Sequence, residues 1–299
     1  GRAPTEADVD RYEHFYAFVD VLVIGGGIAG LQAARAAGAS GARVLLLEQA
    51  NHWGGRTPVD VEGGEAAVAE ALAALESMPN VTLRLRTMGA GVYDHGYVLG
   101  YERVADHAPE LCDAGAPRHR LWKIRARQVV TATGAIERPL SFPGNDLPGV
   151  LLASAARDYV VNWAVAPGRR VVVVTNNDDA YRTALTLRAH GLEVPAVIDA
   201  RPEGGGGLMA EAEAAGLRVL RGAGIHKALG KARVEAVEVG PQAGRKATET
   251  IPCDAVAMSG GWSPVVHLWS HCGGKLLWSD THAHFYPDPA LPPTGADGQ

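Results

Sequence analysis

The sequence predicts an α/β protein with parallel sheets, because buried strands and helices alternate in two separate stretches of the chain. In the first stretch, a continuous apolar run at 21–24 is followed by a glycine-rich turn and an alanine-rich helix at 31–37. In the second, an apolar run at 171–174 is followed by a helix at 178–190. Apolar runs of this length are typical of strands that are buried on both faces. We therefore expect two similar units.

The order of the other predicted elements indicates that the second unit is inserted in the first. The first unit continues with strands at 43–47, 81–85 and 121–132 and a helix at 65–77. The second continues with a strand at 194–198, a short helix at 210–215 and an antiparallel meander at 217–220 and 232–239, after which the chain returns to a buried strand of the first unit at 253–258. We predict a discontinuous first domain at 1–149 and 251–284, an inserted domain at 150–250, and a proline-rich tail without a core pattern at 285–299.

The charge of the chain argues against several classes of partner. Among 299 residues, 28 are Lys or Arg and 33 are Asp or Glu, which gives a net charge of −5. No run of five or six basic residues occurs, so nucleic acid and anionic membranes are disfavoured. The longest apolar stretch, at 21–31, is too short and too rich in glycine to span a bilayer. Charged residues throughout 1–13 argue against a secretory signal.

The cysteines are few and scattered, at Cys112, Cys253 and Cys272. Because none of them forms a C-x-x-C pair, the sequence argues against structural zinc, an iron–sulfur cluster and a redox-active disulfide. So few thiols favour a reducing compartment, and we expect a cytoplasmic protein.

The strongest functional motif is the glycine loop Gly25-x-Gly27-x-x-Gly30, which lies between a predicted strand and a predicted helix. Gly25 permits the sharp turn, Gly27 lets a pyrophosphate approach the backbone, and Gly30 lets helix and strand pack closely. Glu48 ends the next strand, where it can accept hydrogen bonds from both ribose hydroxyls and would repel a 2′-phosphate. This favours NAD or FAD over NADP. The alternative is an ordinary tight turn with a chance glutamate.

Two further segments agree with a dinucleotide site. Gly54-Gly55-Arg56 follows Glu48 after a short loop, where flavoproteins with two dinucleotide folds bring backbone and a side chain near the pyrophosphate. The A-T-G segment that includes Thr133 and Gly134 is similar to the one that returns the chain to the nucleotide in those proteins. Either segment alone could be a loop by chance.

The second unit lacks the glycines of the first. Residues 175–180 read Thr-Asn-Asn-Asp-Asp-Ala, and side chains at Thr175 and Asn177 would obstruct a pyrophosphate. Asp178 and Asp179 would repel it at the helix N-terminus, whereas Asn177 or Asp178 would make a good N-cap. Our hypothesis is that this unit keeps the dinucleotide fold but has lost the usual nicotinamide-nucleotide site.

These motifs, in this order, resemble the NAD-binding part of the α subunit of heterotetrameric sarcosine oxidase, over roughly 12–280. The segments that carry the resemblance are DVLVIGGG at 20–27, YDHGYV at 93–98, ATGAIERP at 132–139, TNND at 175–178, and CD at 253–254 leading to SGGWSPVVHL at 259–268. The resemblance implies two Rossmann-like folds of the pyridine-nucleotide-disulfide-oxidoreductase type, without the redox cysteines.

The resemblance also implies cofactors and partners. It implies NAD in the first fold, with FAD as the alternative, and FMN near an interface with the β subunit. Sarcosine would be oxidised at FAD on the β subunit, and electrons would pass through FMN to oxygen to give hydrogen peroxide. The family's ferredoxin-like and folate-binding domains are absent from this sequence, so we expect a subunit portion that is not active alone.

The resemblance carries a set of nucleotide-contact positions onto this chain. Gly89 stands where a valine would offer its backbone near the adenine. Together with the motifs above, the expected cofactor-binding residues are Gly25, Gly27, Ala29, Gly30, Glu48, Gln49, Gly55, Arg56, Gly89, Thr133 and Gly134.

No residue is expected to be catalytic or to bind metal. Tyr93, Asp94, His95 and Tyr97 are interpreted as a hydrogen-bonded turn. His267 and His271 could share a helix face, but no third ligand accompanies them, so a structural role is favoured. Two other functions stay open: a subunit of a related dehydrogenase, such as opine oxidase or a cyanide-forming glycine-oxidising enzyme, and a truncated, non-catalytic NAD-binding module.

Overall fold

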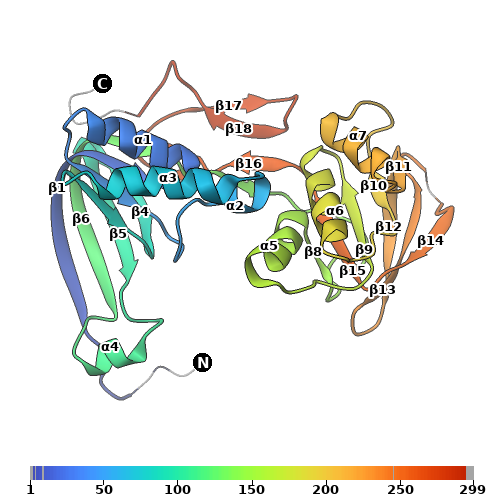
Figure 1. The fold of residues 1–299 in the computed structure, drawn as a ribbon, viewed down its shortest axis with the longest axis horizontal. Helices are drawn as coiled ribbons and strands as arrows, with labels where there is room; N and C mark the ends of the chain where they lie inside the picture. Colours follow the sequence, from blue (N-terminus) through green and yellow to red (C-terminus); the bar gives the residue numbers. More distant parts are fainter. Residues whose placement is uncertain (1–2, 4, 9, 245, 294–299) are drawn as a thin grey trace. The chain divides into compact units, whose positions relative to one another are not determined.

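The computed structural model describes residues 3, 5–8, 10–244 and 246–293. The chain forms two compact units, of which the first comprises Gly1–Gly134 and Pro264–Gln299 and the second Ala135–Ser263 (Figure 1). The second unit is therefore an insert in the first.

The first unit is built on a six-stranded sheet in the order β3-β2-β1-β6-β5-β4. Strands β1, β2, β3 and β6 are parallel, whereas β4 and β5 add antiparallel neighbours beside β6. The strands are β1 Tyr12–Ile24, β2 Val44–Leu47, β3 Val81–Arg84, β4 Thr87–Tyr93, β5 Tyr97–Arg103 and β6 His119–Thr131. The helices are α1 Ile28–Ala39, α2 Thr57–Asp60, α3 Gly64–Glu76, α4 Pro109–Asp113 and α8 His267–His271, with a 3-10 turn at Asp94–Gly96.

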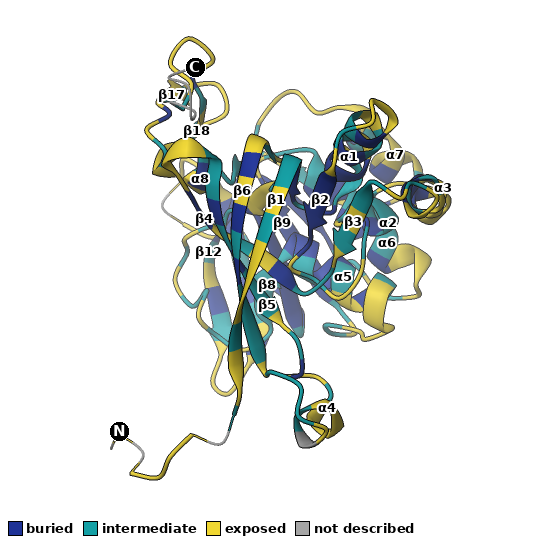
Figure 2. Ribbon diagram, turned by 90° about the vertical axis from the view of Figure 1, so that its left-hand side faces the viewer, coloured by how far each residue is buried: buried dark blue, intermediate teal, exposed yellow. Residues whose placement is uncertain are grey.

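Hydrophobic cores lie on both faces of this sheet, because successive side chains of a strand point to opposite faces. Val23 and Leu46 pack with Leu31 of α1 and Leu75 of α3 on one face. On the other face, the core comprises Leu22, Ile24, Leu45, Leu47, Val92, Val98, Trp122, Ile124, Ala126 and Leu268. Burial on both faces explains why β2 is entirely apolar (Figure 2).

The second unit has three layers. A parallel sheet in the order β11-β10-β9-β15-β8 is covered on one face by α5, α6 and α7, and on the other by the antiparallel sheet β12-β13-β14. The helices are α5 Ala153–Trp163, α6 Asp179–Ala189 and α7 Gly207–Ala214. The strands are β8 Val150–Leu152, β9 Val171–Thr175, β10 Val197–Asp199, β11 Val219–Arg221, β12 Ala223–Gly230, β13 Val234–Pro241, β14 Glu249–Pro252 and β15 Ala255–Ser259.

Two short ribbons complete the chain. β7 Ala135–Glu137 pairs with β16 Trp262–Pro264, and β17 Leu276–Ser279 pairs with β18 His284–Pro287. The rings of Trp278 and Phe285 meet edge to face across the second ribbon, with their centroids 4.9 Å apart.

The predicted α/β fold class is confirmed, but several predicted boundaries are wrong. The insert extends beyond 150–250, because β15, expected in the first domain, pairs with β8 and β9 in the second sheet. The segment at 217–220 belongs to the parallel sheet, since β11 pairs with β10, so the meander consists of β12, β13 and β14. The expected tail at 285–299 begins inside β18, and its last six residues lie outside the described part of the chain.

The hairpin of β4 and β5 was not predicted, because Gly89, Gly91 and Gly100 interrupt its apolar alternation. Its turn agrees with the interpretation of the tyrosine-rich segment at 93–97. His95 and Gly96 both have positive φ, of 61° and 62°, as a tight reversal requires.

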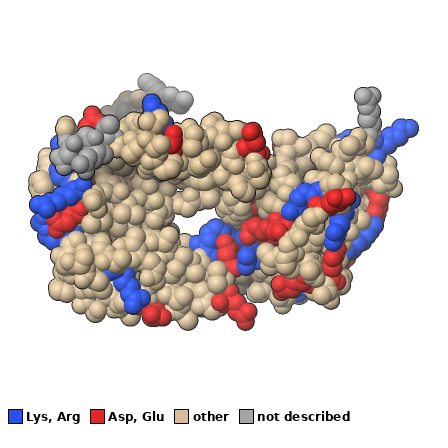
Figure 3. Space-filling view, turned by 90° about the horizontal axis from the view of Figure 1, so that it is seen from above, with Lys and Arg blue, Asp and Glu red and all other residues tan. Residues whose placement is uncertain are grey.

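No described helix is long and apolar enough to cross a membrane. Basic and acidic side chains lie intermixed on the face drawn in Figure 3. All three cysteines are free, and burial raises the pKa of the Cys253 thiol to about 11.

Candidate functional site

The turn between β1 and α1 is held by close backbone packing. Gly25 has φ +109°, and a Cβ at this position would overlap the carbonyl oxygen of Ala132, just after β6. A Cβ at Gly30, in the first turn of α1, would overlap the carbonyl oxygen of Gly25. Both residues must therefore be glycine for α1, β1 and the end of β6 to approach as they do.

Gly27 differs from these two glycines. Its φ of −67° suits any residue, and a Cβ added here would meet nothing within 4 Å. The fold itself therefore does not require glycine at this position. The missing side chain instead leaves open space beside the N-terminus of α1.

The N-terminus of α1 can accept an anion. The N–H groups in the first turn of a helix have no intrahelical partners. Here no side chain caps the helix, and its first turn carries no acidic residue. With the positive end of the helix dipole, these N–H groups form a ready site for phosphate oxygens.

Glu48, directly after β2, places a carboxylate next to this turn. The side chain is only 8% exposed. Its Oε2 accepts a hydrogen bond from the N–H of Gly26 at 2.6 Å, and its Oε1 accepts one from the N–H of Ala50 at 2.7 Å. Both bonds hold the carboxylate in a single orientation, with lone pairs left for a further donor.

The segment after Glu48 also returns to the glycine turn. The N–H of Gly54 donates to the carbonyl oxygen of Gly26 at 2.8 Å, and a Cβ at Gly55 would lie 3.1 Å from the Cα of Gly27. Arg56, which directly precedes α2, donates from Nε and Nη2 to Asp60, both at 2.9 Å, so its charge is paired with that of the last residue of this helix.

Two hydrogen bonds to Val265 hold the A-T-G segment. Thr133 donates its hydroxyl to the carbonyl oxygen of Val265 at 2.9 Å. Gly134 has φ +70°, and its carbonyl oxygen accepts from the N–H of Val265 at 3.0 Å. Gly89 lies on β4, where a Cβ would come within 2.6 Å of the side chain of Ile24.

The structure thus brings most of the predicted residues to one place. The turn glycines, Glu48, Gly55 and the A-T-G segment surround the start of α1, whereas the side chains of Ala29 and Gln49 are exposed to solvent. Sequence reasoning missed Trp53, whose ring lies where a Cβ on Gly26 would be. No motif in the sequence marks this tryptophan.

An open helix N-terminus, free space at Gly27 and an oriented carboxylate after the second strand fit the diphosphate and ribose of a dinucleotide.

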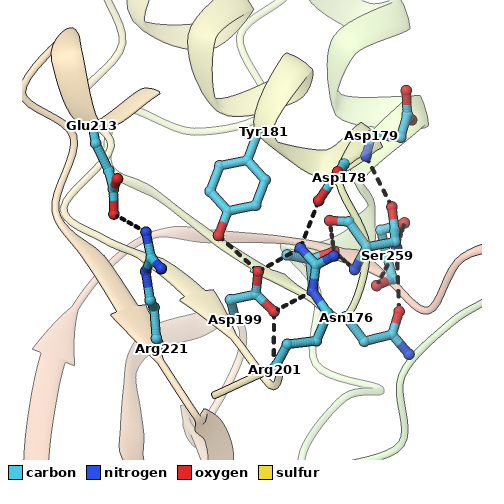
Figure 4. A network of polar contacts seen from close by, with 11 residues as sticks. Asn176, Asp178, Asp179, Tyr181, Asp199, Arg201, Glu213, Arg221 and Ser259 are labelled. Atoms are coloured by element: carbon cyan, nitrogen blue, oxygen red, sulfur yellow. Dashed lines mark hydrogen bonds and ion pairs between the residues drawn. The ribbon is translucent and has the colours of Figure 1, made fainter. Parts of the chain in front are cut away.

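The corresponding turn in the second unit is closed by its own side chains (Figure 4). Asn177 accepts the N–H of Asp179 at 3.1 Å through Oδ1, which caps α6. Its Nδ2 donates to the hydroxyl of Ser259 at 3.0 Å, and the hydroxyl of Thr175 accepts the N–H of Asn177 at 3.0 Å. One N–H of the first turn of α6 is therefore already bonded to a side chain, and the first turn also carries the carboxylate of Asp179, unlike that of α1.

Asp199 ends β10, as Glu48 follows β2, but it is fully buried and bound within the unit. Its Oδ2 accepts the hydroxyl of Tyr181 at 2.7 Å and Nη2 of Arg201 at 2.7 Å. Arg201 also donates to Asp178 at 2.8 Å (Figure 4). Burial, together with the bond to Asp199, raises the pKa of the Tyr181 hydroxyl well above its usual range.

Both histidines of α8, His267 and His271, are exposed. The ring of His271 lies against that of Tyr93, with their centroids 6.5 Å apart. Within the described ranges, no three His, Cys, Asp or Glu side chains lie together as metal ligands.

A sequence profile of the pyridine nucleotide-disulphide oxidoreductase family matches residues 19–278. The chain belongs to this family. Membership makes it an oxidoreductase-family protein and implies a flavin or nicotinamide dinucleotide as cofactor.

Curated relatives bear out the resemblance to sarcosine oxidase. The chain is 42% identical to the alpha subunit of sarcosine oxidase from Rhizobium meliloti (strain 1021), over 95% of this chain and 28% of the relative. It is 41% identical to the corresponding alpha subunit from Corynebacterium sp. (strain P-1), over 95% of this chain and 30% of the relative. An opine oxidase subunit from Agrobacterium tumefaciens (strain Ach5) is more distant, at 27% identity over 90% of this chain and 58% of the relative. The chain spans less than a third of the length of the sarcosine oxidase relatives.

Solved structures agree on the fold of this family member. L-proline dehydrogenase from P. horikoshii superposes with a TM-score of 0.68, at 25% identity, over 93% of this chain and 48% of that chain. Thioredoxin reductase from T. acidophilum superposes with a TM-score of 0.67, at 18% identity, over 94% of this chain and 91% of that chain.

The two glycines of the first turn should differ in their effect on stability. Gly30→Ala places a methyl group against backbone and should lower the free energy of unfolding by about 3 kcal/mol. Gly27→Ala places it in open space and should cost at most about 1 kcal/mol. Urea unfolding followed by circular dichroism measures both, and equal losses would show that the packing at Gly30 does not constrain the turn.

The ion pair between Arg201 and the buried Asp199 should contribute more to the free energy of unfolding than the exposed pair between Arg221 and Glu213. Arg201→Met leaves Asp199 buried without its cation and should cost about 3 kcal/mol. Arg221→Met, whose partner Glu213 is exposed, is the matched control and should cost less than about 1 kcal/mol. The same unfolding assay compares them, and a small loss for both variants would contradict the role given to Arg201.

Proposed function

We propose that this chain is the dinucleotide-binding part of a sarcosine oxidase alpha subunit. It supports the oxidative demethylation of sarcosine to glycine, with formation of hydrogen peroxide, in a multi-subunit flavoenzyme. The observation that carries the proposal is the identity of 39–42% to three such subunits along 95–96% of this chain.

The proposed cofactor of the first unit is NAD, with FAD as the alternative. When bound, either dinucleotide supplies two-electron redox chemistry. The first-turn N–H groups of α1 bind the diphosphate, and Glu48 accepts the ribose hydroxyls and excludes a 2′-phosphate. The proposed contacts are Gly25, Gly27, Ala29, Gly30, Glu48, Gln49, Gly55, Arg56, Gly89, Thr133 and Gly134.

In the proposed assembly, flavins transfer the electrons. The absence of a C-x-x-C pair and the buried, protonated thiol of Cys253 leave no dithiol for disulfide chemistry, which favours electron transfer through flavins. We place FMN at an interface between subunits and FAD on a partner beta subunit. The chain by itself then forms no peroxide, oxygen is the acceptor of the assembly, and the enzyme is cytoplasmic.

The identity of the bound nucleotide tests this proposal most directly. Denaturing the purified chain should release NAD, identified by its mass and absorbance. The Gly27→Ala variant keeps the fold. It should retain at most about one tenth of the wild-type amount of nucleotide, because its methyl group occupies the space for the diphosphate.

Lys231→Ala, an exposed change in the second unit, is the control and should retain the wild-type amount. Released FAD would instead indicate a free-standing flavoprotein reductase. A chain that is folded but empty, and takes up neither dinucleotide, would contradict the proposal.

The second unit should not bind a nicotinamide dinucleotide. Its turn is filled by the side chains of Asn177 and Thr175, and the carboxylates of Asp178 and Asp179 at the start of α6 already hold the arginines that could otherwise bind a diphosphate. Crystals soaked with NADH should therefore show no nucleotide density against residues 175–180. Density at that turn would overturn the proposal that this site is lost.

A further inference from the structure

The N-terminal half of β1 has an open edge. β6 pairs with β1 from Tyr12 onward, but β2 pairs only with Val21–Ile24. Among the described strands, none therefore lies beside Tyr12–Val19 on the side away from β6. Alternate residues of this segment direct their N–H and C=O groups to the open side. An exposed edge of this length is a template for one more strand.

An aromatic and basic face accompanies this edge. Tyr12, Tyr16 and Phe18 alternate along β1 and expose 55%, 63% and 66% of their surface. Lys123 and Arg125 of β6 and Tyr97 of β5 share their side of the sheet, and we call these six residues the aromatic–cation face. Figure 2 shows exposed residues along this part of β1. Clustered apolar rings on a surface mark an interaction site more often than a free one.

The contacts within the face place its members on one side of the sheet. Nζ of Lys123 lies 5.3 Å from the centre of the Tyr16 ring, and Cζ of Arg125 lies 4.7 Å from the centre of the Tyr97 ring. Phe18 is paired in register with Arg125.

The two cations of the face have no carboxylate partner among the described residues. Lys123 contacts His14 and Tyr16, and Arg125 donates to the backbone carbonyl of His95. The neighbouring arginines of the same strand pair differ, because Arg118 and Arg120 both bind carboxylates. The part of the face around Tyr16 and Phe18 therefore presents two cations without a described carboxylate partner, whereas Tyr12 at its end donates its hydroxyl to Asp8 at 3.0 Å.

This charge discriminates between two occupants. A second copy bound through a two-fold axis would present the same face, and so bring like charges together. A segment that carries carboxylates would pair with both cations instead, and an extended segment would also satisfy the open edge. We propose that an acidic, extended segment contributed by a partner subunit forms an additional strand at the edge of Tyr12–Val19 and packs on the aromatic–cation face. This inference rests on the proposed multi-subunit function.

The test is a titration of the purified 299-residue chain with a purified beta subunit of the sarcosine oxidase type, by calorimetry and hydrogen–deuterium exchange. Binding should slow exchange at alternate amides of residues 13–19. Phe18→Ser and the double variant Lys123→Glu/Arg125→Glu should each raise the Kd at least tenfold. The affinity of the wild-type chain should fall with added salt, because the contact pairs opposite charges.

Matched controls lie in the second unit. Tyr159→Ser removes an aromatic ring that is 47% exposed, and Lys231→Glu reverses an exposed charge. Both should leave the Kd unchanged. Circular dichroism melts confirm that every variant is folded, which is expected because the substituted rings and charges of the face are solvent-exposed or half-buried.

The outcomes separate this inference from the function on which it rests. A complex whose Kd and exchange pattern ignore the face variants overturns the inference alone and leaves the proposed assembly intact. No complex with the wild-type chain overturns both the beta-subunit partnership and the inference. A wild-type dimer in sedimentation that Phe18→Ser dissociates would show that the occupant is a second copy, and would also overturn the proposal.

Discussion

The constraint on which the candidate site depends is the close approach of three backbone segments at Gly25. The carbonyl oxygens of Gly25 and Ala132 occupy the volumes in which side chains of Gly30 and Gly25 would lie. This contact sets the start of α1 against the ends of β1 and β6. The position of the free helix N–H groups follows from it, and so does their distance from the Glu48 carboxylate. The diphosphate site that we propose here therefore rests on backbone packing more than on any reactive side chain.

In the second unit, the polar groups at the corresponding turn form their hydrogen bonds and ion pairs within the unit itself. Its strand–turn–helix and its acidic residue after the next strand correspond to those of the first unit. However, Asn177 caps α6, and Arg201 neutralises Asp199 inside the unit. Burying such a carboxylate without a cation would be costly, so the ion pair has become part of the fold. Two copies of one architecture thus differ in whether their polar groups remain available to a ligand.

The open edge of β1 takes no part in the candidate nucleotide site. The first unit ends its parallel pairing with β2 at Val21, yet β1 and β6 continue together through Tyr12. This N-terminal extension of β1 contributes no residue to the candidate site around the start of α1, and it leaves the rings of Tyr12, Tyr16 and Phe18 exposed to solvent. Such a surface is consistent with a chain that works within an assembly, as the alpha-subunit names of its relatives indicate for those proteins.

The sequence by itself determined the parts that depend on local order. Apolar runs predicted β1, β2 and β9, and the spacing of Gly25, Gly27, Gly30 and Glu48 predicted the geometry around α1, because each signal lies within one strand–turn–helix unit. The side-chain types at 175–180 likewise predicted a turn unlike the first. Tertiary structure alone decided which sheet β15 joins, since a buried strand of this kind can pair in either unit. It also decided that Asp199 is bonded to Tyr181 and Arg201 and that Phe18 stays exposed. These properties depend on neighbours distant in the chain, and no local pattern of residues encodes them.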